Sequence, residues 1–182
     1  KSRIVNTVIL SNRRFNYEEA QQIIETGQGD FAPEMLALDR LAKQLRARRF
    51  AEGAISFERN EVKFILDETG KPVDVFFKVA KDSNKLVEEF MLLANRTVAE
   101  TIGMAKNKTS KKPKTFIYRV HDKPSDDRLM SLAGMASRFG HKMPAVGNPR
   151  TISQGINKLV KDVHGRPEEN LISMMAIRSM AK

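Results

Sequence analysis

The stretch KLVEEFMLLAN at residues 85–95 is the segment on which the packing of the chain depends. It begins a predicted helix over about 84–105, because its apolar residues recur at three- and four-residue spacing and form one apolar face. That face consists of Val87, Phe90, Met91, Ala94, Val98, Ile102 and Ala105. Side-chain oxygens at residues 82–84 are placed to cap its first amide groups. With extended segments before and after it, this helix is predicted to be the central packing element.

Short segments rich in β-branched and aromatic residues are predicted to be strands. They are residues 4–10, 54–58, 62–67, 73–79 and 115–121. In 62–67 and 73–79 the apolar residues alternate, which predicts one buried face for each strand. Gly70 lies in the short connection between these two strands and predicts a hairpin turn, since glycine accepts a positive φ.

The other predicted helices begin and end at recognisable capping residues. Asn16 caps a helix through Thr26, and Glu19 completes a capping box. Further helices are predicted over residues 33–51, 125–139, 151–163 and 167–182, opened by Pro33, Ser125 or Asp126, Thr151 and Pro167. Adjacent antiparallel strands followed by most of the helices predict an α+β fold, with a mixed or antiparallel sheet packed with helices.

The composition is that of a globular, basic chain. It has 182 residues, 41% hydrophobic residues, no cysteine and a formal net charge of +10. One domain is expected, and no apolar run approaches the roughly 20 residues that span a bilayer. The absence of cysteine excludes disulfides and thiolate metal sites. Both ends look cut, because the chain does not begin with Met and its last predicted helix has no stop signal.

The positive charge favours a polyanionic partner over a merely soluble surface by a small margin. Basic residues gather in two groups, at residues 40–49 on a predicted helix and at residues 106–114 in a predicted loop. A run of charge is usually a solvated face. Tracking of phosphates along a single strand is the competing interpretation.

Several segments, in order, resemble the ribonuclease II / ribonuclease R family of exoribonucleases. They are RRFNYEEAQ at 13–21, LAKQLRARRFAEGAISFE at 41–58, FILDETGKP at 64–72, LVEEFMLLAN at 86–95, YRVHDKPS at 118–125 and AIRSMAK at 176–182. The resemblance is closest to bacterial ribonuclease R and covers nearly the whole chain. It implies part of a larger catalytic domain that degrades single-stranded RNA from 3′ to 5′ by hydrolysis, with Mg²⁺, in the cytoplasm.

Clustered carboxylates are the usual ligands of the Mg²⁺ ions that activate water for phosphodiester hydrolysis. The adjacent acids are Glu18-Glu19, Glu88-Glu89, Asp126-Asp127 and Glu168-Glu169. Each pair is expected near the first turn of a helix, where the helix dipole alone favours acids. The resemblance implies that the catalytic aspartates lie upstream of residue 1 and that an arginine motif lies downstream of residue 182. No metal ligand or catalytic residue is therefore assigned here, and the isolated chain is expected to be inactive.

Tyr17 is the leading candidate for RNA binding. It follows Arg13 and Arg14 on the first turn of a predicted helix. A tyrosine there either packs on its neighbours or offers its ring to a base, and the residues alone do not decide between the two. The resemblance favours stacking, because the family's matching tyrosine stacks on the 3′ end of the RNA.

Weaker candidates lie on two other segments. Arg119 and Lys123 flank His121 and could contact phosphates, although a histidine at a strand end is more often structural. Asn95 is mildly unfavourable inside a helix, which suggests a specific hydrogen bond, and Glu89 could serve the same network. Glu89 and Asn95 are interpreted as supports of the site.

Two other classes of function stay open on the sequence. The parent protein could be a catalytically inactive relative that binds RNA without cutting it, and the state of the upstream aspartates would tell the two apart. A purely structural domain is the third class, and it predicts no affinity for RNA at low salt.

Overall fold

The computed structural model describes residues 3–57, 61–104 and 112–180. Most of the predicted basic loop at 106–114 therefore lies outside the described residues. The chain divides into two compact units, residues 1–46 with 60–117, and residues 47–59 with 118–182. No helix of the described residues is long and apolar enough to cross a membrane.

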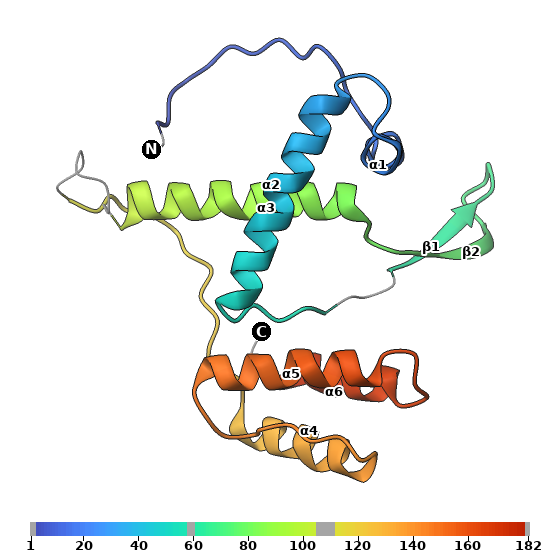
Figure 1. The fold of residues 1–182 in the computed structure, drawn as a ribbon, viewed down its shortest axis with the longest axis vertical. Coiled ribbons are helices and arrows are strands. Elements are labelled where there is room, and N and C mark those ends of the chain that lie inside the picture. Colours follow the sequence, from blue (N-terminus) through green and yellow to red (C-terminus); the bar gives the residue numbers. More distant parts are fainter. Residues whose placement is uncertain (1–2, 58–60, 105–111, 181–182) are drawn as a thin grey trace. The chain divides into compact units, whose positions relative to one another are not determined.

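Three α-helices and a hairpin make up the first unit (Figure 1). The helices are α1 (Tyr17–Thr26), α2 (Ala32–Ala51, whose last turn from Ala47 belongs to the second unit) and α3 (Asp82–Val98). A π-helical turn at Ala99–Gly103 continues α3. The predicted bounds of α1 and its capping box are confirmed, and Gly27 ends α1 with a φ of 70°.

The burial of α3 differs from the prediction. Its N-cap is Lys81, so residues 82–84 lie inside its first turn, and Asn84 Oδ1 accepts a bond of 3.1 Å from the Lys81 amide. Its buried residues are Ser83 and Glu89, whereas the predicted apolar positions Val87 and Met91 are exposed. The predicted apolar stripe is therefore not the face that α3 buries here, because polar and ionic side chains make its contacts with α1 and α2.

The hairpin is formed by β1 (Glu61–Leu66) and β2 (Pro72–Lys78), which pair antiparallel with Phe64 opposite Val75. Asp67 organises the turn: its Oδ1 accepts bonds from the Thr69 hydroxyl at 2.6 Å, the Thr69 amide at 2.9 Å and the Lys71 amide at 3.0 Å. The Thr69 hydroxyl, followed by the Lys71 amide, lowers the pKa of the Asp67 carboxyl. Gly70 has a φ of 83°, as the predicted turn requires.

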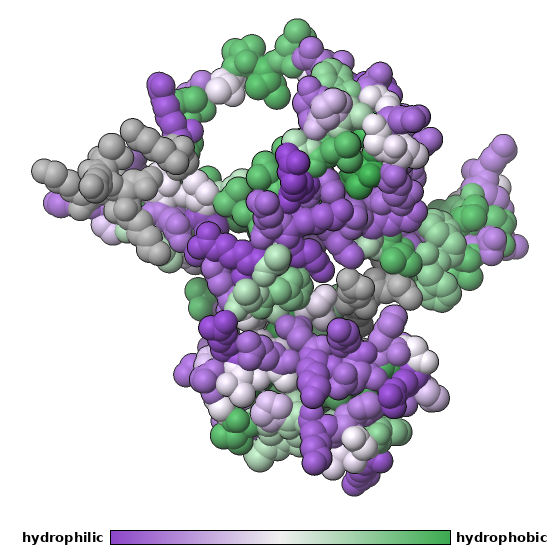
Figure 2. Space-filling model, viewed as in Figure 1, coloured by the Kyte–Doolittle hydropathy of each residue, from purple (hydrophilic) through white to green (hydrophobic). Residues whose placement is uncertain are grey.

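Both faces of the hairpin are open to solvent, which corrects the prediction of one buried face. Phe64 and Phe77 are 61% and 65% exposed, and apolar side chains show on the hairpin at the right of Figure 2. Phe76 and Ile65, on the alternate positions, are also exposed. Two strands alone bury little surface, and their ladder and turn connect them.

Three predicted strands are wrong. Residues 4–10, 54–57 and 115–121 have no regular secondary structure, and residue 58 lies outside the described part of the chain. A strand forms only where a second strand completes its ladder. In 54–57 a side chain takes that place, because Asn157 donates to the Ala54 carbonyl at 2.8 Å and accepts from the Ser56 amide at 3.0 Å. The α+β class is nevertheless confirmed.

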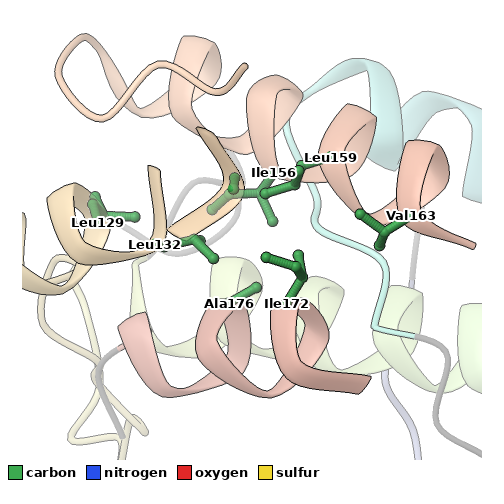
Figure 3. Packing of buried hydrophobic residues seen from close by; sticks show 8 residues of the cluster. Leu129, Leu132, Ile156, Leu159, Val163, Ile172 and Ala176 are labelled. Carbon is green, nitrogen blue, oxygen red and sulfur yellow. The ribbon is translucent and has the colours of Figure 1, made fainter. Parts of the chain in front are cut away.

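Three helices pack around an apolar core in the second unit. They are α4 (Asp126–Arg138), α5 (Pro149–Val163) and α6 (Glu169–Ser179). Their core residues are fully buried and interdigitate between the helices (Figure 3), namely Leu129, Leu132, Ala136, Ile156, Leu159, Val163, Ile172 and Ala176.

The starts of α5 and α6 correct two predictions, whereas the predicted N-cap Ser125 of α4 is confirmed. Asn148, not Thr151, caps α5, because its Oδ1 accepts from the Thr151 amide at 2.9 Å. Ser125 is the N-cap of α4 but makes no side-chain capping bond. The last helix begins at Glu169 rather than at Pro167, and ends at Ser179.

Candidate nucleic-acid interface

The first turn of α1 holds Tyr17 in place. Asn16 Oδ1 accepts from the Glu19 amide at 2.7 Å, and Glu19 Oε2 accepts from the Asn16 amide at 3.0 Å. These reciprocal bonds fix the turn that carries the tyrosine. Tyr17 is 42% exposed, so it is not a core residue.

A lysine from β2 completes the surroundings of the ring. Lys78 Nζ lies 5.5 Å from the centroid of the Tyr17 ring, within the range of a cation–π contact. An aromatic ring and an ammonium group, two kinds of group that contact bases and phosphates in other proteins, thus lie side by side. Nothing in the sequence indicates Lys78, because it is distant from Tyr17 along the chain.

A pocket of about 280 Å³ opens beside Tyr17, between α1 and the first turn of α3. Gln21 joins the two helices: its Oε1 accepts from the Ser83 amide at 2.9 Å, and its Nε2 donates to Glu25 at 2.8 Å. Gln21 is buried and lies one helical turn after Tyr17. The four-residue spacing from Tyr17 was the one sign in the sequence that Gln21 could belong to the same site, since residues four apart share a helix face.

Arg13, one of the two arginines before Tyr17, is bound to other groups of the protein. The Arg13 guanidinium lies 5.1 Å from the centroid of the Phe15 ring, and it is 3.5 Å from both Glu19 and Asp30. Phe15 in turn meets Phe31 edge to face, with ring centroids 6.4 Å apart. Arg13 therefore links the segment before α1 to the connection between α1 and α2.

Glu89 belongs to the packing of α2 against α3. Its side chain is 3% exposed and lies 3.7 Å from Arg46 Nη1. Nearby, Lys43 Nζ bridges Asp39 at 2.7 Å and Asp82 at 3.0 Å. These two acids, Asp39 first, raise the pKa of Lys43 by hydrogen bonding to its ammonium group.

Glu89 and Asn95 have different surroundings on α3. Asn95 lies exposed farther along α3, whereas Glu89 faces Arg46 of α2. Glu89 is structural in these contacts. That Glu89 and Asn95 support an RNA site stays a prediction.

Arg119, His121 and Lys123 lie in the irregular segment before α4, and all three are exposed. They belong to the second unit, which begins again at residue 118, whereas Tyr17 belongs to the first. Their contacts with RNA stay a prediction.

The described residues do not fit a Mg²⁺ site. No three carboxylate or imidazole groups among them come together as a ligand set. Glu19 serves the α1 cap, and Glu89 faces Arg46. The Glu88-Glu89 pair also lies well beyond the first turn of α3, contrary to the prediction, because that helix begins at Asp82.

The Glu168-Glu169 pair is bound to two histidines. His141 Nε2 lies 3.0 Å from Glu168 in a nearly buried contact, and His164 Nδ1 lies 3.0 Å from Glu169. The hydrogen bond with His141 lowers the pKa of Glu168. The Gly165 amide, followed by His164, lowers the pKa of Glu169. The sequence carried no signal for the His141 contact, which joins the loop after α4 to the start of α6.

A basic α+β chain that offers an exposed aromatic ring beside an ammonium group has the chemistry of a nucleic-acid-handling domain. The chain belongs to the RNB-domain family, because the model of the RNB domain matches residues 1–182. Ribonuclease R 1 of Lactococcus lactis is 30% identical over 97% of this chain and 21% of its own length. Ribonuclease R of Thermotoga maritima is 31% identical over 97% of this chain and 24% of its own length.

DIS3-like exonuclease 2 of Caenorhabditis elegans is 38% identical over 74% of this chain and 17% of its own length. The predicted membership in the ribonuclease R-like family is thus confirmed. The chain spans about a fifth to a quarter of the ribonuclease R relatives it matches.

Solved structures share the fold. Mycoplasma genitalium RNase R in complex with ribose-methylated single-stranded RNA has a TM-score of 0.76 and 23% identity, over 93% of this chain and 26% of that one. The same enzyme in complex with double-stranded RNA also has a TM-score of 0.76 and 23% identity, over 93% and 30% of the two chains.

Proposed function

We propose that this chain is the RNA-holding part of the catalytic domain of a 3′→5′ exoribonuclease. The parent enzyme would hydrolyse single-stranded RNA one nucleotide at a time in the bacterial cytoplasm. Support comes from the RNB-domain match over the whole chain and from relatives named ribonuclease R. The net charge of +10 suits a polyanionic substrate.

The observation that carries this proposal is the half-exposed Tyr17 ring beside Lys78 Nζ. A base stacked on a protein ring contributes about 1–3 kcal/mol in any sequence context, because every base has a π-face. The ammonium group beside the ring would meet the phosphate that follows the base. An exonuclease needs this kind of contact, since it must hold each new 3′ end whatever its base.

The chemistry itself is assigned to other parts of the parent enzyme. Bound Mg²⁺ would activate water and stabilise the leaving oxygen, and its ligands would lie outside these 182 residues. Within the described ranges no acidic cluster fits the ion. We therefore expect the isolated chain to bind RNA and leave it intact.

The test uses the 182-residue chain, labelled single-stranded RNA and Mg²⁺. Tyr17→Ala should weaken binding by at least about five-fold, since 1 kcal/mol of stacking corresponds to roughly that factor. Tyr17→Phe keeps the ring and is the matched control, which should bind like the unchanged chain. Equal RNA affinities of the unchanged chain, Tyr17→Ala and Tyr17→Phe, with unchanged melting temperatures, would refute the stacking role. Stepwise shortening of the RNA by the 182-residue chain would refute the placement of the active site outside it.

In the parent enzyme the same Tyr17→Ala change should lengthen the final oligonucleotide product. Short RNAs depend most on the end contact, because they have few other contacts. If the parent enzyme binds RNA but never shortens it, the catalytically inactive relative is the correct reading.

A further inference from the structure

Ser83 presents a buried polar group without a hydrogen-bond partner. Its side chain is 3% exposed, and its Oγ has no partner among the described residues. A hydroxyl left in this state destabilises the folded chain, because the hydrogen bonds that it made to water are not replaced. Ser83 lies in the first turn of α3, a helix of 17 residues, and it lines the pocket beside Tyr17.

The groups around this hydroxyl favour a negative charge on one side of the pocket. Lys78 and Lys81 line it together with the positive end of the α3 dipole. Asp82 of the same turn already faces Lys43 at 3.0 Å, so a cation balances its charge. The Ser83 amide is bound to Gln21, so the hydroxyl is the polar group of Ser83 that is left for a ligand. Lys81 lines the same pocket, as does Lys78, whose ammonium group also lies beside the Tyr17 ring.

The residues of α1 that line the pocket have a different chemistry. Glu18 and Glu25 are among them, and Glu25 accepts a hydrogen bond from Gln21. Carboxylates repel a second phosphate but accept hydrogen bonds from ribose hydroxyls or base amino groups. A volume of about 280 Å³ is near the lower limit for small-molecule pockets, which start at about 300 Å³. The pocket therefore suits a single nucleotide better than a longer segment.

We propose that this pocket binds one nucleotide, with its phosphate held by the Ser83 hydroxyl and the ammonium groups of Lys78 and Lys81. A rotation about χ1 moves Oγ between staggered positions and lets the hydroxyl donate to a phosphate oxygen. The nucleotide comes either from an RNA chain or from a free mononucleotide. The expectation that the nucleotide belongs to an RNA chain rests on the proposed exoribonuclease function. The phosphate site rests only on the groups that line the pocket.

The experiment follows the amide resonances of the ¹⁵N-labelled 182-residue chain during titration with inorganic phosphate, AMP, adenosine and the dinucleotide ApA. We expect AMP and inorganic phosphate to shift the amides of residues 81–84 in a saturable way. Adenosine, which lacks the phosphate, should leave them in place. Tighter binding of ApA than of AMP would indicate an RNA diester as the ligand, and the reverse order would indicate a free monophosphate.

Two variants test the assigned groups. Ser83→Ala should weaken AMP binding about ten-fold, as expected for the loss of one hydrogen bond to a charged group. It should not lower the melting temperature, because the removed hydroxyl has no partner in the folded chain. Lys81→Gln should weaken AMP binding as well, while Lys158→Gln on α5 makes the same charge change outside the pocket and should have no effect.

Three outcomes would overturn the proposal: no saturable shift at residues 81–84, a response to adenosine equal to that of AMP, or unchanged AMP affinity in Ser83→Ala and Lys81→Gln. None of these outcomes touches the loss of RNA binding expected for Tyr17→Ala. Failure of the phosphate site is therefore distinguishable from failure of the proposed function.

Discussion

At the scale of single residues, Arg46 and Glu89 show how an ionic contact replaces the expected apolar one. Glu89 is buried on α3, and the guanidinium of Arg46, 3.7 Å away, contributes to the compensation of its charge. A buried carboxylate without a nearby cation is costly, because the protein interior solvates it poorly. This pair therefore specifies where α2 crosses α3 in the first unit.

Arg46→Met should lower the free energy of unfolding by about 3 kcal/mol, since the packing volume stays while the buried carboxylate of Glu89 loses the cation beside it. Urea unfolding at pH 7 is the measurement. Arg40→Met, at an exposed position of the same helix, is the control and should change stability by less than about 0.5 kcal/mol. The double variant Arg46→Met with Glu89→Gln should recover part of the lost stability. Equal losses in Arg46→Met and Arg40→Met would contradict the stabilising role of Arg46.

At the scale of elements, two helical glycines have opposite environments. A Cβ on Gly155 of α5 would lie 2.6 Å from Cδ and 2.7 Å from Cγ of the Pro144 ring. A Cβ on Gly134 of α4 would meet nothing within 4 Å. Gly155 thus lets the loop before α5 pack directly on the helix, whereas Gly134 has no such role.

Gly155→Ala should destabilise the second unit by about 1–3 kcal/mol, because the proline ring has no free side-chain end that could move aside. Gly134→Ala should stabilise it by about 0.5–1 kcal/mol through helix propensity alone. Thermal unfolding of both variants is the measurement. Stabilisation by both alanines would show that the loop does not rest on α5.

The contact between His141 and Glu168 makes the second unit sensitive to acid. The pKa of Glu168 is lowered in the folded chain, so its contribution to stability is complete above its ordinary value of 4.5 and disappears as the pH falls through the folded pKa. The melting temperature of the unchanged chain should therefore decrease as the pH is lowered below about 4.5.

Glu168→Gln should show a smaller fall over the same range, because it has no carboxylate to protonate. Asp162→Asn removes an exposed carboxylate from α5 without touching this contact, and it should keep the full acid sensitivity. Parallel acid profiles for Glu168→Gln and the unchanged chain would count against the contact.

At the scale of the whole molecule, the charge of +10 should make RNA binding depend steeply on salt. Each phosphate neutralised on a single strand contributes about −0.7 to the slope of log K against log salt concentration. A chain that uses about three cations should show a slope of about −2. Fluorescence anisotropy at several salt concentrations measures it.

Lys78→Gln should make that slope shallower by about 0.7, whereas Lys158→Gln should leave it unchanged. An affinity that does not respond to salt would favour a structural domain whose charge serves solubility.

The sequence by itself determined the features that depend on residues close together in the chain. The capping box of Asn16 and Glu19, the glycine end of α1 and the Gly70 turn are as predicted. Helices and turns satisfy their backbone groups within a few residues, so local patterns suffice to predict them. The ordered family segments and the candidate Tyr17 were likewise visible without coordinates.

The tertiary structure alone decided which surfaces meet. Residues 4–10 and 115–121 have strand-forming side chains but no strand, because a ladder needs a partner that no local pattern guarantees. The buried face of α3 was set by Arg46 and Gln21 of other helices. Lys78 came to lie beside Tyr17 only through the path of the hairpin and α3, since contacts between residues remote in sequence are set by packing as a whole.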